Sequence, residues 1–130
     1  MKATEIMIGD RLAYRGQFAA FDFRVEQVTK HKVGYHAEPG ENRMHYLRLN
    51  EVQPIPLTPD MLERNGFEKV QNLLVLQWEN GVYPSMIFVE YNPENYCLFI
   101  NDMMFPKPVR FLHELHHILM DCGIEKEITP

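Results

Sequence analysis

The first half of the chain alternates apolar and polar residues in short bursts. The apolar positions of three bursts are Phe21, Phe23 and Val25, then Val33, Tyr35 and Ala37, then Met44 and Tyr46. Mostly charged residues and histidines stand between them, and this period of two is typical of β-strands with one buried face. Turn formers such as Pro39-Gly40 separate the bursts. The pattern predicts four or five short antiparallel strands before residue 56.

Such a set of strands predicts a particular fold. Four or five strands in about fifty residues are too few for a sandwich, but closure into a small barrel hides their edges. We therefore predict an α+β protein whose residues 1–56 form a small β-barrel of the Src-homology-3 or Tudor type. The connector Pro54-Ile55-Pro56 ends this lobe, because proline fixes its own φ and keeps the preceding residue extended.

A short helix is predicted directly after the connector. Thr58 is a preferred N-cap residue, and Pro59 suits the first helical position. Leu57 and Leu62 have the spacing of a hydrophobic staple. Gly66 suits the left-handed conformation that often follows a helix. These signals predict a helix over residues 59–65.

Three apolar runs then predict an antiparallel meander. They cover residues 73–78, 86–91 and 96–100, and turn signals at Asn80-Gly81 and at 92–95 separate them. Consecutive positions in these runs are apolar, so both faces of the sheet are expected to be dry. Two helices cover one face. We predict that the barrel, or a second copy of the protein in a homodimer, covers the other.

A second helix is predicted near the end of the chain, from Pro108 to Gly123. Proline at its start and glycine just past its end favour these limits. At about 100° per residue, one stripe of this helix is apolar and should face the core. The stripe consists of Phe111, Leu112, Leu115, Ile118, Leu119 and Cys122. Residues 57–130 therefore form an α-β-β-β-α lobe in this prediction.

The same helix carries a motif of zinc proteases. His113, Glu114 and His117 spell HExxH, in which two histidines bind zinc and the glutamate acts as general base. The histidines share a face that points nearly opposite the apolar stripe, so we expect both imidazoles to face solvent. The longer HExxHxxGxxH pattern fails at Met120 and Gly123. We therefore predict a coincidental motif, with no metal site, no cofactor and no enzymatic activity.

Two weaker alternatives concern metals and small-molecule pockets. A zinc-dependent hydrolase would use His113 and His117 as ligands, and surface metal binding would add His116. Trp78, Tyr83 and Tyr91 could line a pocket, although core packing explains these aromatic residues equally well. The sequence has no phosphate-cradling glycine loop.

Charge and cysteine content narrow the class of protein. The net charge is -5, with eight Lys/Arg against seven Asp/Glu up to residue 55 and five against eleven after it. Neither half resembles a nucleic-acid binder on charge alone. Cys97 and Cys122 are too few for a disulfide scaffold and are expected to be buried free thiols. No signal peptide or membrane span is evident, so we expect a cytoplasmic protein.

Nucleic-acid binding through the barrel is an alternative that the residues leave open. Arg43, His45 and Arg48 would carry it. The acidic second half argues against it, because phosphate binding requires a basic face. Solvated strand residues are the preferred interpretation of these three side chains.

The chain resembles a family of small uncharacterised proteins of Bacteroides-type bacteria and their phages and mobile elements. The resemblance rests on Ile8-Gly9-Asp10, on Pro54-Ile55-Pro56-Leu57-Thr58 with Gly66-Phe67, and on Val109-Arg110-Phe111-Leu112-His113-Glu114-Leu115. In the family, His-Glu-Leu is typically followed by Gln-Asn, where this chain has His116-His117. The resemblance implies no activity and argues against zinc catalysis, because the second zinc ligand exists only in this variant.

Together these patterns predict a non-enzymatic accessory or adaptor protein of phage or mobile-element origin. It would bind another macromolecule, most plainly a protein, and no membrane.

Overall fold

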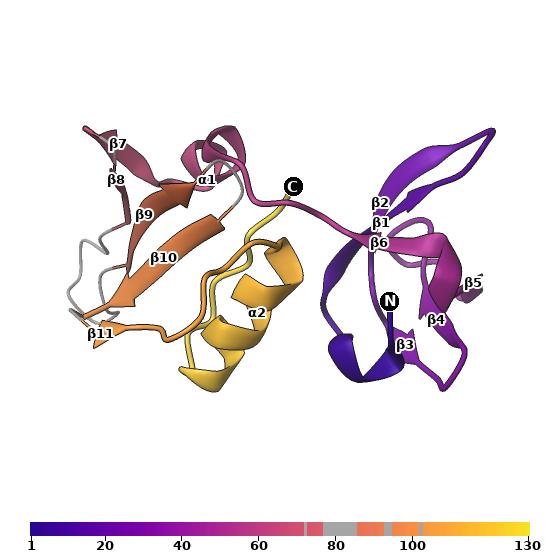
Figure 1. Ribbon diagram of the computed structural model, residues 1–130. Helices are drawn as coiled ribbons and strands as arrows, with labels where there is room; N and C mark the ends of the chain where they lie inside the picture. Colours follow the sequence, from indigo (N-terminus) through magenta and orange to yellow (C-terminus); the bar gives the residue numbers. More distant parts are fainter. Residues whose placement is uncertain (72, 77–85, 93–94, 102) are drawn as a thin grey trace. The chain divides into compact units, whose positions relative to one another are not determined.

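The computed structural model describes residues 1–71, 73–76, 86–92, 95–101 and 103–130 (Figure 1). The protein is α+β, with antiparallel sheets and two short α-helices among the described residues. The chain divides into two compact units, residues 1–55 with Pro130 and residues 56–129. Each unit is described by itself.

The first unit contains two three-stranded antiparallel sheets. One has the order β2-β1-β6, from β1 (Arg11–Arg15), β2 (Ala20–Arg24) and β6 (Val52–Pro54). The other has the order β3-β4-β5, from β3 (Gln27–Val28), β4 (Lys32–Tyr35) and β5 (His45–Arg48). Two 3-10 helices complete the unit, η1 (Ala3–Glu5) and η2 (Leu49–Glu51).

Both sheets of the first unit contribute to one hydrophobic core. Its buried members are Ile6, Leu12, Phe23, Val25, Val33 and Val52. Only Val25 and Glu26 separate β2 from β3, so one continuous run of chain passes from the first sheet to the second. Among the described strands the two sheets are not joined into a closed barrel. Antiparallel strands are confirmed, although the structure has six of them where four or five were predicted, and the barrel type is not established by this topology.

The third burst of the sequence faces the opposite way from our prediction. Leu47 lies opposite Val33 in the β4–β5 register and packs against the core, which places His45 on the core side and Tyr46 on the outer side. Tyr46 is accordingly 50% exposed. The prediction was wrong because Met44 and Tyr46 appeared to be the apolar members, although the core contact of Leu47 sets the register.

The second unit is built on one five-stranded antiparallel sheet of order β11-β10-β9-β8-β7. Its strands are β7 (Glu68–Val70), β8 (Leu73–Leu76), β9 (Met86–Asn92), β10 (Asn95–Ile100) and β11 (Met103–Met104). The three predicted central strands are confirmed. The short edge strands β7 and β11 were not predicted, because two or three residues show no periodicity.

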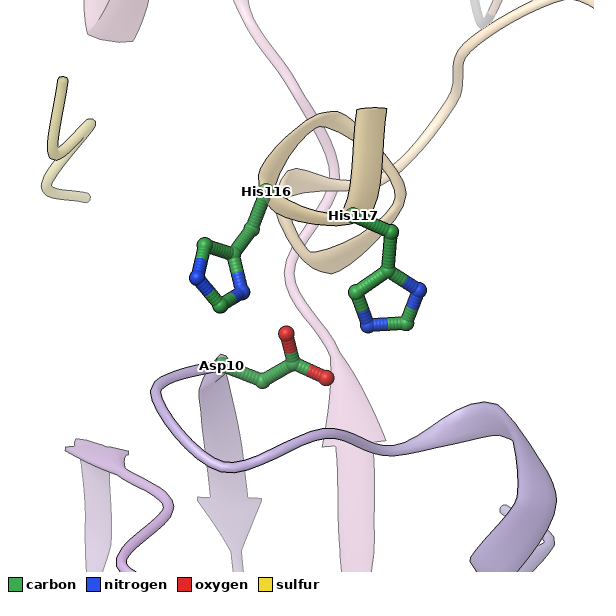
Figure 2. A group of neighbouring side chains, drawn as sticks. All are labelled: Asp10, His116 and His117. Atoms are coloured by element: carbon green, nitrogen blue, oxygen red, sulfur yellow. The ribbon is translucent and has the colours of Figure 1, made fainter. Parts of the chain in front are cut away.

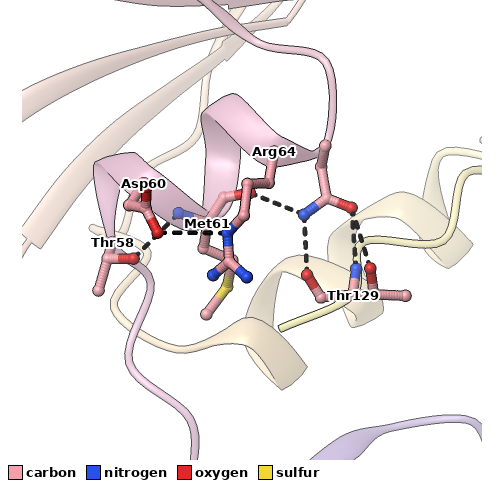
Figure 3. Close-up of polar contacts among 6 residues, drawn as sticks. Thr58, Asp60, Met61, Arg64 and Thr129 are labelled. Carbon is pink, nitrogen blue, oxygen red and sulfur yellow. Dashed lines mark hydrogen bonds and ion pairs between the residues drawn. The ribbon is translucent and has the colours of Figure 1, made fainter.

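The first helix, α1 (Pro59–Arg64), forms as its local signals predict (Figure 3). The Thr58 hydroxyl accepts the Met61 N–H at 3.1 Å, which caps the first turn. Gly66 adopts φ 96°, and the Phe67 N–H donates to Leu62 O at 3.1 Å, so the helix ends in the left-handed geometry that glycine allows. Arg64 pairs with Asp60 one turn earlier at 3.2 Å.

The second helix, α2 (Leu112–Asp121), begins later than predicted. Val109 forms an antiparallel bridge with Tyr96 through two hydrogen bonds, Tyr96 N to Val109 O and Val109 N to Tyr96 O. This bridge keeps residue 109 extended, so a helix cannot start at Pro108. The end is as predicted, with Gly123 at φ 69°.

The core of the second unit lies on one face of the sheet. Leu112, Leu115 and Leu119 of α2 are buried, whereas Phe111 and Ile118 are half-buried and Cys122 is exposed. The predicted stripe was therefore too wide. On the sheet, the Phe67 ring contacts Phe88 with centroids 5.3 Å apart.

The remaining predictions concern two aromatic residues, a turn, the cysteines and membrane spans. Trp78, Tyr83 and the Asn80-Gly81 turn lie outside the described residues. Both cysteines are free, but Cys97 is half-buried and Cys122 is exposed, so the prediction that both are buried was wrong. None of the described helices has the length and apolar character needed to cross a membrane.

Candidate functional site

The face of the five-stranded sheet opposite the core is apolar from edge to edge. Strand register places two rows of side chains on it, because directly paired residues point to the same face. One row is Val70, Leu73, Val89 and Cys97, and the other is Glu68, Val75, Ile87, Phe99 and Met104. We call these nine residues the outer face. The register thus places apolar residues on both faces of this sheet, whereas a dry outer face, covered by the barrel or by a second copy, stays a prediction.

Burial distinguishes the outer face from the core face. Along β8 and β10 buried and half-buried residues alternate. The half-buried residues belong to the outer face, except Asn95 at the start of β10. At its two edges Val70 is 50% and Met104 60% exposed. The only charged residue among the nine is Glu68 at one edge. This surface is suited to bind another apolar surface rather than a charged ligand.

The HExxH motif is arranged differently from a catalytic site. Glu114 Oε1 accepts the backbone N–H of Phe111 at 3.0 Å and that of Arg110 at 3.2 Å. Phe111 occupies the N-cap position and has no side-chain oxygen, so the carboxylate three residues later supplies the missing acceptor. The group that a protease would use as general base therefore caps the helix.

The sequence predicted that both motif histidines face solvent, and the structure shows that they do not. The His113 side chain is buried, at 7% exposure, and its ring stacks on Phe111 with centroids 5.9 Å apart. His117 is half-buried, and its ring meets the edge of His113 at 5.6 Å. The prediction failed for His113 because the helical repeat takes no account of the Phe111 ring, which stacks on His113 from the N-cap position. Among the described residues, no third ligand atom forms a metal-sized group with this pair.

His116 and His117 occupy adjacent positions of α2 and are both half-buried (Figure 2). Their ring centroids lie 6.0 Å apart at an angle of 56°. Asp10, drawn in the same figure, belongs to the first unit and is fully buried. Its Oδ2 accepts the Met7 N–H at 2.8 Å and its carbonyl accepts the Val25 N–H at 2.8 Å, so this residue closes the turn that precedes β1.

The three candidate nucleic-acid residues do not share one face. His45 lies on the core side of β5, where its ring contacts Tyr35 at 5.5 Å and its Nε2 lies 3.0 Å from Glu41 Oε1. Arg48 projects from the opposite side of β5, and Arg43 lies in the exposed loop before the strand. The three weak candidates Arg43, His45 and Arg48 therefore do not form one cluster.

A hollow of about 600 Å³ lies beside β2 and the loop at 36–40. Phe21, Phe23 and Tyr35 contribute to its wall, with ring centroids 5.0 to 6.2 Å apart. Rings this close are in contact with one another and leave no room for a cation between them, so they do not form an aromatic cage. The wall also contains both signs of charge and selects no ligand by charge.

Two surface features were not predicted from the sequence. Val70 and Met104 belong to edge strands too short to recognise, and Tyr46 was placed on the wrong face of β5. If Leu47 had been assigned to the core side of β5, its neighbour Tyr46 would have been predicted on the outer side. Comparisons with family models, with curated proteins and with solved structures find no match to this chain.

Proposed function

We propose that this chain is a non-enzymatic accessory protein that binds other macromolecules, and that its outer face pairs two copies of the chain into a homodimer. The observation that carries the proposal is the continuous apolar surface across five strands. Exposed apolar patches of this kind mark interaction sites, because leaving them in water costs free energy that a partner surface recovers.

A second copy is the partner that best fits the outer face. With one charge in nine residues, the face offers no electrostatic selection for a charged partner. Two flat apolar sheets pack face to face about 10 Å apart in β-sandwiches. A two-fold symmetric dimer would create that arrangement from two identical surfaces.

The first unit supports an adaptor role at the level of fold. We propose that it is a small barrel of the Src-homology-3 or Tudor type, because two sheets share one core and the β2–β3 run passes between them. Small barrels are used widely as binding modules, which is an analogy of fold. The resemblance to proteins of Bacteroides-type bacteria and their phages or mobile elements stays a prediction, as does a cytoplasmic location.

The geometry of the HExxH motif favours the non-enzymatic proposal over a zinc hydrolase. A general base must point its carboxylate at the metal-bound water. Glu114 instead points Oε1 at two backbone N–H groups of its own helix start.

The dimer is tested by adding charge at the exposed edges of the outer face. We expect wild-type protein to sediment as a dimer. The double variant Val70→Glu with Met104→Glu should sediment as a monomer, because each unpaired carboxylate buried at an interface costs several kcal/mol. The dissociation constant should rise at least about a hundredfold. Both side chains are at least half exposed, so the monomer should stay folded.

Met103→Glu is the matched control. Met103 is 74% exposed and neighbours Met104, but it pairs with Ile100 and therefore points to the core side of the sheet. This variant should remain a dimer. A wild-type monomer at every concentration, or a dimer that both variants weaken equally, would contradict the proposal.

A further inference from the structure

The outer side of the β3-β4-β5 sheet in the first unit carries a second, chemically different surface. Register places Gln27, Gly34 and Tyr46 in one row of this surface and Lys32 and Arg48 in the next. All except Gly34 are exposed. We call these five residues the tyrosine face.

Tyr46 lies across the sheet rather than standing upright on it. Its hydroxyl donates to Gln27 Oε1 at 3.0 Å, although β4 separates β5 from β3 and the two outer strands are about 10 Å apart. The side chains of Tyr46 and Gln27 must therefore lean toward each other over β4. A Cβ at position 34 would lie 3.0 Å from Met44 and 3.2 Å from Gln27, so these two side chains already occupy the space above Gly34.

This arrangement fixes an aromatic ring at the surface. Tyr46 as a residue is 50% exposed while its hydroxyl is held by Gln27. A fixed and exposed ring can stack with a flat partner without first losing much rotational freedom. Planar heterocycles such as nucleic-acid bases are partners of this kind.

Two cations lie beside the ring. Lys32 and Arg48 are directly opposite each other in the β4–β5 register, and like charges in this position destabilise a sheet. The described residues include no carboxylate in an ion pair with either of them. Lys30 and His31, in the turn before β4, are also exposed. A bound anion would relieve the repulsion between the two cations.

We propose that the tyrosine face binds single-stranded nucleic acid, with a base stacked on Tyr46 and backbone phosphates at Lys32 and Arg48. An unpaired base is required, because bases inside a duplex do not offer their π-faces. The proposal differs from the predicted cluster, since it uses Tyr46 and Lys32 and excludes His45. It is independent of the homodimer.

The test measures fluorescence anisotropy of a labelled oligothymidine of about twelve nucleotides at about 20 mM salt, where phosphate contacts are strongest. We expect saturable binding. The logarithm of the association constant should fall with the logarithm of the salt concentration at a slope of about -1.4, because each of two phosphate contacts contributes about -0.7. A duplex of the same length should bind at least about fivefold more weakly, because it offers no unpaired base.

Variants separate stacking from charge. Tyr46→Ala should weaken binding about tenfold and leave the salt slope unchanged, whereas Tyr46→Phe keeps the ring and should stay within about threefold of wild type. Arg48→Gln should reduce the slope by about 0.7. Lys107→Gln, which removes an exposed charge in the second unit, is the matched control and should change neither quantity.

Three results would overturn the proposal. They are no binding at low salt, equal weakening by Lys107→Gln and Arg48→Gln, or competition by polyglutamate as effective as that by unlabelled oligothymidine. The last result would show a general anion surface. Each chain of the Val70→Glu, Met104→Glu double variant should bind the oligonucleotide as wild type does. A failure of the homodimer proposal would therefore leave this test unaffected.

Discussion

At the residue scale, one carboxylate organises the loop between β4 and β5. Glu41 Oε2 accepts the N–H of Ala37 at 3.0 Å and that of Glu38 at 3.4 Å, and Glu41 Oε1 lies 3.0 Å from His45 Nε2. The hydrogen bond from His45 is the main cause that holds the pKa of Glu41 below its usual value of 4.5, although partial burial opposes it. Burial, with Glu41 and Tyr14 nearby, raises the pKa of Tyr35, which therefore stays a neutral phenol.

The lowered pKa predicts that acid loosens this loop. Because the folded state favours the ionised carboxylate, its stabilising effect is complete above pH 4.5 and is lost as the pH falls through the lower folded-state pKa. Amide NMR should show the Ala37 and Glu38 signals shifting together below pH 4.5. Glu41→Gln should abolish this transition, and Glu38→Gln should keep it. An unchanged transition in Glu41→Gln would contradict the assignment.

At the element scale, the start of α2 depends on the carboxylate of Glu114 rather than on a cap from residue 111. Glu114→Ala removes the acceptor of two N–H groups and should lower the free energy of unfolding by about 1 kcal/mol. Urea unfolding followed by circular dichroism measures this change. Glu63→Ala, at an exposed position of α1, should have little effect.

The zinc hypothesis predicts a different result for Glu114. If Glu114 were a general base, Glu114→Ala would leave the stability unchanged and abolish a zinc-dependent hydrolysis. Elemental analysis of untagged wild-type protein in parallel would then find stoichiometric zinc. We expect a loss of stability and no such zinc.

At the scale of the whole molecule, the end of the chain returns to α1 of the second unit. The Asn65 amide donates to Met61 O at 2.7 Å and to Thr129 O at 2.8 Å, and its oxygen accepts the Thr129 N–H at 3.0 Å. Ile124 and Ile128 of this returning segment are buried. One side chain therefore links residues that lie 64 positions apart in the sequence.

Asn65→Ala is predicted to destabilise the second unit alone. The variant loses three hydrogen bonds to backbone groups and a fourth, longer one at 3.4 Å from the Thr129 hydroxyl. At about 1 kcal/mol for each backbone bond, partly replaced by water, the loss should cost about 2 kcal/mol. Hydrogen exchange resolved by peptide should become faster within 56–129 and stay unchanged within 1–55. Thr129→Ala keeps both backbone bonds and is the matched control, with an effect below about 0.5 kcal/mol. Faster exchange in both units would contradict this prediction.

The sequence by itself determined the elements whose signals are local. Thr58, Pro59 and Gly66 define α1 because capping and glycine conformation depend only on neighbouring residues. The apolar strand runs and the α2 end at Gly123 followed from equally local patterns.

Tertiary contacts decided where α2 begins, what surrounds His113 and which way Tyr46 points. The bridge from Val109 to Tyr96 delays α2, and His113 is buried with its ring stacked on that of Phe111. The pairing of Leu47 with Val33 turns Tyr46 outward. The bridge and the strand register depend on partners far away in the sequence, and the stack on His113 comes from a residue outside the helical repeat. Periodicity within one segment contains no information about such contacts.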